Sequence, residues 1–331
     1  MPAQIRRPTP ANLRRLAAAL RRGEVVALPT ETVYGLAANA LDARACRRIF
    51  RAKRRPAEDP LIVHVLGLSQ AAQVAELNDA ARQLATAFWP GPLTLVLPKR
   101  AVVPAVVTSG LSSVAVRAPA HRLFRRVLRL AGVPLAAPSA NPFGYLSPTQ
   151  ATHVQESLGR RIRNILDGGP CRHGMESTIV DLRQPERPRL LRRGVIAAAE
   201  VAAVLGRGVT TGRSGMPAKG PAVAPGLMKR HYSPKATMRL VRKIGPTMAA
   251  RGGGDTALVF FRKPTVAGRS TRVFWLSVDG SARSAARRLY DLLHRIDRRG
   301  CDHVLVELAP REAGPLGTAI NERLRRAAAK D

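Results

Sequence analysis

The chain has 331 residues, 45% of them apolar, and is long enough for one large or two ordinary globular domains. Its 55 basic and 22 acidic side chains give a formal charge of +33, which indicates attraction to polyanions without specifying one. No stretch of about eighteen apolar residues runs without a charge or proline, so a soluble, cytoplasmic protein is expected. The cysteines, at positions 46, 171 and 301, are widely spaced and odd in number, which argues against disulfides and zinc and predicts buried thiols.

The first predicted element is an amphipathic helix that begins at Pro10 behind Thr9 and ends before Gly23. Strands and helices then alternate, which predicts one α/β domain over residues 1–207. The expected elements are strands at 25–28, 61–65, 93–97, 114–117, 134–137, 177–182 and 189–192, a helix capped by Asp42 and a helix opened by Pro148.

Periodicity is lost over residues 208–235, where Gly, Pro, Ala, Lys and Arg dominate, and this predicts an extended interdomain linker. A second, small α/β domain is expected over residues 236–331. Its expected elements are strands at 257–261, 273–276 and 304–308 and helices at 282–298 and 318–329.

Residues 29–36, Pro-Thr-Glu-Thr-Val-Tyr-Gly-Leu, directly follow an apolar strand. They place hydroxyls and a carboxylate at a strand end, where α/β folds bind small polar ligands. An ordinary turn, in which Thr and Glu cap the next element, is the alternative.

Three basic residues, Lys53, Arg54 and Arg55, end a helix just before the chain turns toward the strand that contains His64. Such a cluster would bind a triphosphate. Compensation of the helix dipole is the alternative, and sequence position does not separate the two.

Further polar residues stand at other strand ends. Arg117 suits bidentate capture of a carboxylate, and Ser139 and Asn141 are expected to offer hydroxyl and amide groups to the same rim. Residues 176–181 bring another hydroxyl to the start of a strand, and residues 192–194 bring two arginines and a glycine to the end of the next one. Both stretches could equally be surface turns. The linker string 225–234 holds His and Tyr between two prolines, an unusual content for a passive tether, and predicts a lid.

Together these strings resemble the long, two-domain form of the threonylcarbamoyl-adenylate synthase family. The resemblance implies a YrdC-like twisted open α/β sheet domain, a linker and a small Rossmann-like α/β domain. The sequence departs from the family at Asp59, where Asn is frequent, and at Arg54, where Gly is common. We expect these departures to tune the activity rather than abolish it. The strings that carry the resemblance lie at 29–36, 53–61, 89–94, 114–117, 138–148, 176–181 and 225–234.

The resemblance also implies roles for individual residues. L-Threonine would be held by Thr32, His64, Arg117, the backbone at Ala137, and Ser177. ATP would be held by Arg55, Asp59, Ser113, Ser139, Ser147, Arg193 and Tyr232. The catalytic groups would be Lys53, Arg55, Ser139 and Asn141.

The implied reaction is synthesis of L-threonylcarbamoyladenylate from L-threonine, bicarbonate and ATP, with release of pyrophosphate. The product would serve threonylcarbamoyladenosine (t6A) modification of tRNAs that read ANN codons. A tRNA threonylcarbamoyl transferase machinery would be the downstream partner, and weak electrostatic tRNA binding is a further expectation. Mg²⁺ is expected as the cofactor, bound through the ATP phosphates rather than by a protein metal site.

Two other classes of protein share features with this sequence. The charge would suit a non-catalytic basic RNA-binding or ribosome-maturation protein, but aromatic residues are only 4% and no base-stacking strings stand out. A carbamoyl-transfer enzyme of hydrogenase maturation would need paired cysteines and a much longer chain.

Overall fold

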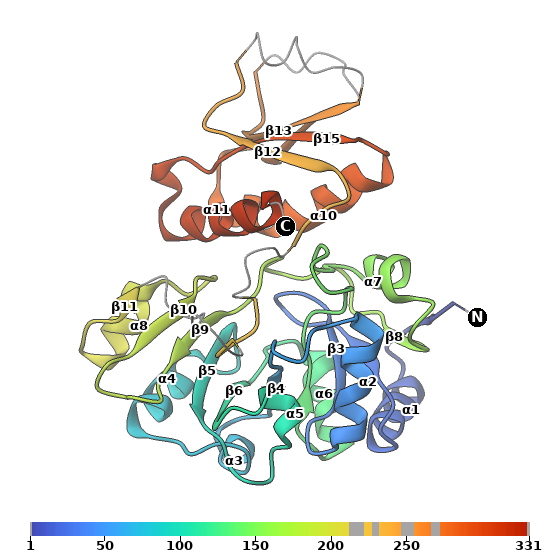
Figure 1. The fold of residues 1–331 in the computed structure, drawn as a ribbon, viewed down its shortest axis with the longest axis vertical. Coiled ribbons are helices and arrows are strands. Elements are labelled where there is room, and N and C mark those ends of the chain that lie inside the picture. The colour runs from blue at the N-terminus through green and yellow to red at the C-terminus, as the bar shows by residue number, and fades with distance from the viewer. Residues whose placement is uncertain (1, 212–221, 227–231, 246–254, 266–271, 330–331) are drawn as a thin grey trace. The chain divides into compact units, whose positions relative to one another are not determined.

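The computed structural model describes residues 2–211, 222–226, 232–245, 255–265 and 272–329. The chain forms two compact units (Figure 1). The first comprises Met1–Phe143, Pro148–Cys171 and Glu176–Met228, and the second comprises Gly144–Ser147, Arg172–Met175 and Lys229–Asp331. This grouping follows contacts rather than chain order, so the limits predicted at residues 207 and 235 remain predictions.

A mixed eleven-stranded sheet forms the frame of the first unit, in the order β1-β8-β2-β3-β7-β4-β6-β5-β9-β10-β11. The α/β class predicted from the alternating pattern is confirmed. The strands are β1 (Gln4–Arg6), β2 (Val26–Leu28), β3 (Gly35–Asn39), β4 (Ile62–His64), β5 (Leu93–Pro98), β6 (Ser113–Arg117), β7 (Leu135–Ala136), β8 (Asn164–Leu166), β9 (Thr178–Asp181), β10 (Arg189–Arg192) and β11 (Thr210–Thr211). The helices are α1 (Pro10–Arg21), α2 (Ala43–Lys53), α3 (Leu68–Ala71), α4 (Asp79–Phe88), α5 (Ala105–Thr108), α6 (Arg122–Ala131), α7 (Ala151–Leu158) and α8 (Ala198–Leu205).

Side-chain caps fix the starts of the first two helices as predicted. Thr9 accepts a hydrogen bond from the Asn12 amide, and Asp42 accepts from the amides at the start of α2. The helix expected to open at Pro148 begins instead at Ala151. The carbonyls of residues 148 and 149 accept bonds from the amides of Tyr34 and Cys171, so this stretch pairs with other segments and does not enter the helix.

Two hydrophobic clusters on opposite faces hold the sheet. One face packs against α2, α4 and α7, and the other packs against α1 and α6 over strands β8, β2, β3 and β7. Along β4, β6, β5 and β9, this second face carries a small separate cluster of Ile62, Ala115, Val96 and Ile179, completed by Ala224 from residues 222–226. Residues 222–226 therefore lie on the sheet face where the small cluster is found.

The C-terminus of α2 explains one departure from the family pattern. Arg54 follows the last helical residue with φ 52° and ψ 43°, in the left-handed region. That conformation costs an L-residue with a side chain about 1–2 kcal/mol, whereas glycine adopts it freely. A glycine, common at this position in the family, would fit the same turn without strain.

We therefore expect Arg54→Gly to raise the free energy of unfolding by about 1 kcal/mol, measured by urea denaturation. Arg51→Gly is the matched control because Arg51 is an exposed residue in the last turn of the same helix. That change is expected to lower stability by about 1 kcal/mol. A loss of stability in both variants would contradict the conformational explanation.

The second unit contains an all-parallel four-stranded sheet in the order β12-β15-β13-β14. Helices α10 and α11 pack together on one face of that sheet (Figure 1). The predicted Rossmann-like character is confirmed, although β12 was not anticipated. The elements are β12 (Thr237–Val241), β13 (Thr256–Arg262), β14 (Val273–Ser277), α10 (Ala282–Arg298), β15 (His303–Glu307), a 3₁₀ turn (Arg311–Ala313) and α11 (Gly314–Ala328).

Candidate functional site

Several of the predicted site residues lie on one face of the sheet, because side chains alternate between the two faces along a strand. Side chains two residues apart on a strand share a face. His64 therefore faces the same side as Ile62, and Ser113 and Arg117 face the same side as Ala115. Ile62 and Ala115 belong to the small apolar cluster, which thus forms the floor of the candidate site.

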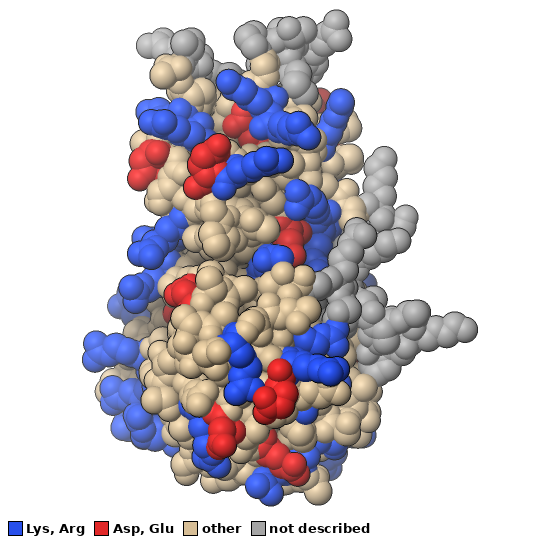
Figure 2. Space-filling model, turned by 90° about the vertical axis from the view of Figure 1, so that its left-hand side faces the viewer, with Lys and Arg blue, Asp and Glu red and all other residues tan. Residues whose placement is uncertain are grey.

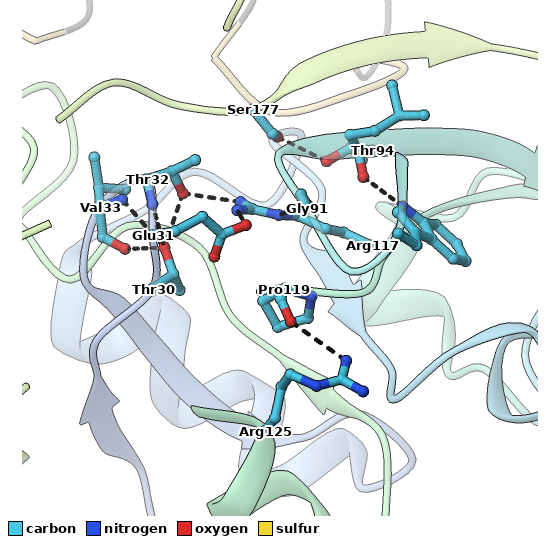
Figure 3. A network of polar contacts seen from close by, with 12 residues as sticks. Thr30, Glu31, Thr32, Val33, Gly91, Thr94, Arg117, Pro119, Arg125 and Ser177 are labelled. Atoms are coloured by element: carbon cyan, nitrogen blue, oxygen red, sulfur yellow. Dashed lines mark hydrogen bonds and ion pairs between the residues drawn. The ribbon is translucent and has the colours of Figure 1, made fainter. Parts of the chain in front are cut away.

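Arg117 is the centre of a buried polar network (Figure 3). Its Nη1 donates to Thr32 Oγ1 at 2.9 Å, its Nη2 donates to Glu31 Oε1 at 2.5 Å, and its Nε donates to the Gly91 carbonyl at 3.2 Å. Arg117 and Glu31 are 3% and 5% exposed, so this ion pair is shielded from water. Arg117 and Thr32, which were both expected to hold L-threonine, are therefore in direct contact.

Thr30 fixes the loop that brings Glu31 and Thr32 to this arginine. Its hydroxyl donates to the Val33 carbonyl at 2.6 Å and accepts from the amides of Thr32 and Val33, both at 3.1 Å. Because the Thr30 proton is used in that bond, the 2.8 Å contact between the two hydroxyls has Thr32 as donor. Thr32 Oγ1 therefore donates to Thr30 and accepts from Arg117, so the donor and the acceptor of each hydrogen bond in this network are defined.

Ser177 lies at the start of β9 and connects to two further side chains. Its Oγ is 2.7 Å from Thr94 Oγ1 and accepts from Arg192 Nη2 at 3.1 Å. The same guanidinium donates to the carbonyls of Ser177 and Pro225, each at 3.0 Å. Arg192 therefore ties the interdomain segment to a residue predicted to hold threonine.

His64 is buried beside Arg117, its register partner in the parallel β4–β6 pair, and its ring packs 5.1 Å from that of Phe124. Burial, helped by the Arg117 charge, lowers the pKa of His64 to about 3. At pH 7 the ring is therefore neutral and can share a hydrogen bond with a substrate hydroxyl.

This lowered pKa predicts how stability depends on pH. Below pH 6.5 the unfolded chain takes up a proton at His64 that the folded chain does not bind until about pH 3. The folded state is therefore penalised progressively as the pH falls through that window, by up to about 1.4 kcal/mol per unit. We expect urea midpoints measured from pH 7 to pH 4 to fall less steeply for His64→Asn than for the wild type. His303→Asn, at an exposed site, should follow the wild-type slope, and equal slopes for all three proteins would contradict the assignment.

A second polar group centres on Lys53 and unites three of the residues predicted to be catalytic. The buried Lys53 Nζ donates to the carbonyl of Ser139 at 2.6 Å and to that of Asn141 at 2.5 Å. Burial, together with the nearby Arg55 charge and against the opposing charge of Asp59, holds the pKa of Lys53 well below its usual range. A bound triphosphate would raise that pKa again and favour the cationic form.

Arg55 and Asp59 form a buried pair next to Lys53. Arg55 donates to the carbonyls of Asp59 and Pro60 at 2.8 and 2.7 Å, and its Nη2 lies 2.9 Å from Asp59 Oδ2. Asp59 is 0% exposed, and neither of its carboxylate oxygens has a hydrogen-bond partner among the described residues. Burial, which outweighs the Arg55 and Lys53 charges, raises the pKa of Asp59.

The structure separates the predicted residues into two ends of one face. Ser113 and Arg117 are the first and last residues of β6, about 13 Å apart at the rise of a strand. Arg117 has its partners in residues 31–32, whereas Ser139 and Asn141 are bound by Lys53, so the single rim expected for them consists of two groups.

The remaining predicted residues have other environments. The Ala137 amide donates to the Ile62 carbonyl, and Arg193 is half-buried after β10. Ser147 belongs to the second unit, where its carbonyl contacts His294, and Tyr232 is buried there against Tyr290 and Arg323. The predicted lid at 225–234 lies partly outside the described residues, and His231 is among those not described.

Sequence reasoning missed several residues of these networks, among them Glu31, Gly91, Thr94 and Arg192. The first three lie within the strings that carry the family resemblance. The pattern offered the Glu31 carboxylate only as a general ligand group or a cap, and it assigned nothing to Gly91 or Thr94. Thr94 could have been found by strand alternation, because it stands two residues before Val96 of the floor.

Other expectations concern thiols, membranes and metals. All three cysteines are free and buried, as predicted. Among the described helices, none is long and apolar enough to span a membrane. Within the same part of the chain, His, Cys, Asp and Glu side chains form no group of three that could hold a metal ion.

Comparison with known proteins places this geometry in a family. Residues 18–194 match the Sua5/YciO/YrdC family model, described as "Telomere recombination", and residues 196–329 match the model "Threonylcarbamoyl-AMP synthase, C-terminal domain". The chain is 44% identical to the threonylcarbamoyl-AMP synthase of Pyrococcus abyssi over 93% of this chain and 91% of that protein. It is 39% identical to the Bacillus subtilis protein of that name over 94% and 91%. The crystal structure of P. abyssi Sua5 complexed with L-threonine superposes with a TM-score of 0.87 at 40% identity and covers 96% of this chain and 94% of that one.

The eleven-stranded sheet with its two buried polar groups defines an α/β protein of the Sua5/YciO/YrdC class. With its second unit, the chain belongs to the threonylcarbamoyl-AMP synthase family, in the two-domain Sua5 form. The resemblance drawn from the sequence strings is confirmed. Members of this family are enzymes of t6A biosynthesis, which favours a catalytic role over a purely RNA-binding one.

Proposed function

We propose that the protein joins L-threonine, CO₂ derived from bicarbonate, and ATP into L-threonylcarbamoyladenylate and pyrophosphate, for t6A modification of tRNA. The observation that carries the proposal is the placement of two buried polar groups toward the two ends of β6, above one apolar floor. Arg117 ends β6, whereas the Arg55–Asp59 pair precedes β4, which runs parallel to β6 with Ile62 beside Ala115, and so lies toward the Ser113 end. A distance of about 13 Å suits an amino acid at one end and a triphosphate at the other. The threonine-bound structure of P. abyssi Sua5 supports an amino-acid site in this fold.

At the Arg117 end, the guanidinium would bind the threonine carboxylate, with Thr32, neutral His64 and Ser177 available to the hydroxyl and amine. The threonine ammonium group first loses a proton to solvent, and the neutral amine then adds through its lone pair to the carbon of CO₂ and releases a second proton to solvent, which gives a carbamate. The protein contributes alignment in a site screened from water, where a carbamate is protected from loss of CO₂.

At the other end, Arg55 and Lys53 would bind the triphosphate, with Ser113, Ser139 and Asn141 beside them. A carbamate oxygen attacks the α-phosphorus, the bond from that phosphorus to the pyrophosphate oxygen breaks, and pyrophosphate leaves with its electron pair. Cations there stabilise the charge that spreads over the phosphate oxygens, worth about 2–4 kcal/mol for each strong contact.

Mg²⁺ would travel with ATP on its phosphates. Asp59 Oδ2 is ion-paired with Arg55, and Oδ1 has no hydrogen-bond partner in the described structure, so Oδ1 fits a role as an additional carboxylate ligand to the ion, which would supply charge neutralisation. The amide that the family often has at this position would be a weaker, neutral ligand.

The downstream partners in this proposal are the tRNA threonylcarbamoyl transferase machinery and, weakly, tRNA itself. The basic side chains on the face seen in Figure 2 are spread over it with Asp and Glu between them, and do not form one continuous patch. A groove in the first unit is lined by five arginines, Arg22, Arg48, Arg51, Arg161 and Arg163, together with one acidic residue, Glu24, which is ion-paired with Arg22. Its contribution to RNA affinity would fall steeply with salt.

Pyrophosphate release from ATP tests this function in the purified full chain. Release that requires both L-threonine and bicarbonate supports the proposed reaction. Salt-sensitive RNA binding by a folded protein that releases no pyrophosphate would instead favour the non-catalytic alternative.

A further inference from the structure

Glu31 is a buried carboxylate with an open oxygen at the threonine end of the site. Its Oε1 is bound to Arg117, but its Oε2 has no hydrogen-bond partner in the described part of the chain. Burial alone would raise the pKa of Glu31, yet the Arg117 charge and hydrogen bond, with smaller contributions from the backbone amides of Glu31 and Ala120, outweigh it and hold that pKa below its usual range. Glu31 is therefore ionised at neutral pH, with a lone-pair site left for a donor.

Arg117 has complementary capacity on the other side of this pair. A guanidinium carries five N–H donors, and the described contacts use three of them. The remaining donors can take a carboxylate while the pair with Glu31 persists. The site thus presents an unused anionic acceptor next to unused cationic donors, both more than nine-tenths buried.

Few small molecules satisfy such a pair. A free carboxylic acid would bind Arg117 but bring its own charge against Glu31, and a simple amine would do the reverse. An α-amino acid carries an ammonium group and a carboxylate on one carbon, so it supplies a partner for each at once.

We propose that Glu31 recognises the α-ammonium group of L-threonine through Oε2, while Arg117 binds its carboxylate. This inference rests on the proposed function, and it makes Glu31 a specificity-determining residue. The rigid Thr30 loop holds the carboxylate in place before the ligand arrives, which reduces the ordering cost of binding.

The experiment compares two ligands by isothermal titration calorimetry on the full chain. One is L-threonine, and the other is 2,3-dihydroxybutanoate of the same configuration, in which a hydroxyl replaces the amine. We expect the wild type to prefer threonine by at least about 30-fold, the range of a buried charge-assisted hydrogen bond. Glu31→Gln should lose most of that preference, because its threonine affinity falls about 10- to 100-fold while its affinity for the analogue stays level or rises.

The comparison separates recognition from a merely supporting role. If Glu31 only positions Arg117, both affinities fall by the same factor in Glu31→Gln, and the proposal is overturned. Unchanged threonine affinity overturns it as well. Asp181→Asn, which removes the charge of another buried, Arg-paired carboxylate, is the matched control and should keep the wild-type preference.

A second variant keeps the test decisive even when the first one does not fold. If Glu31→Gln does not fold, Glu31→Asp keeps the charge and withdraws the oxygen by one methylene. Threonine affinity should then fall several-fold more than analogue affinity, and equal losses would overturn the proposal.

Threonine-dependent pyrophosphate release by the wild type is measured in parallel. A wild type that prefers threonine but releases no pyrophosphate would refute the proposed reaction and leave the recognition by Glu31 standing, whereas a folded wild type that binds neither ligand would overturn both.

Discussion

Arg117→Met is expected to lower kcat/KM for L-threonine by about 100-fold or more, since it removes the cation that binds the substrate carboxylate. The same change leaves Glu31 buried without its partner. Breaking a buried ion pair on one side costs about 3–5 kcal/mol, so part of any loss would come from instability.

The double variant Glu31→Gln/Arg117→Met separates the two effects. With both charges removed, the free energy of unfolding should return most of the way to that of the wild type, while threonine-dependent turnover stays lost. Steady-state kinetics and urea denaturation on the same preparations measure the two quantities. Recovery of turnover together with stability would show that Arg117 acts on the fold and not on the substrate.

Arg55→Ala is expected to reduce kcat/KM for ATP by about 30- to 1,000-fold, the range for loss of one strong cationic contact in phosphoryl or nucleotidyl transfer. Arg55 also holds the carbonyls of Asp59 and Pro60 and is the ion-pair partner of Asp59. The single change would therefore leave a carboxylate with 0% exposure uncompensated.

Asp59→Asn supplies the matched background for this test. Asp59→Asn alone removes the counter-charge of the buried Arg55 and is expected to lose stability, whereas in the double variant both charges are gone. Arg55→Ala/Asp59→Asn should then regain stability and remain impaired toward ATP. Near wild-type ATP kinetics in this double variant would remove Arg55 from the nucleotide site.

Much of the first unit could be predicted from local signals. The Thr9 and Asp42 caps, and the apolar alternation that ends at His64 and Arg117, depend on residues close together in the chain. Strand β3 was missed because its sequence, Gly-Leu-Ala-Ala-Asn, lacks β-branched and aromatic residues. Strand β12 follows the linker directly, where the pattern is short and partly exposed.

The candidate site depends on long-range pairing, which sequence pattern does not encode. Glu31 and Arg117 are 86 positions apart and meet only because the sheet order and the Thr30 loop bring them together. Similarly, the position of Lys53 at a helix end indicates a cation that binds phosphate or compensates the helix dipole. The sequence does not show that this lysine is buried and donates to the carbonyls of Ser139 and Asn141. Composition showed the charge excess but not that the central cations are enclosed.

The most direct test of the proposed synthase follows the carbon of bicarbonate. The full chain is incubated with ¹⁴C-bicarbonate, L-threonine, ATP and Mg²⁺, and the nucleotide products are separated and identified by mass. We predict a labelled adenylate that contains threonine and one added carbonyl, that forms only when all three substrates are present, and that is lost in Arg55→Ala/Asp59→Asn. A folded wild-type protein that places no label in an adenylate, whether or not it releases pyrophosphate, would contradict the proposed reaction.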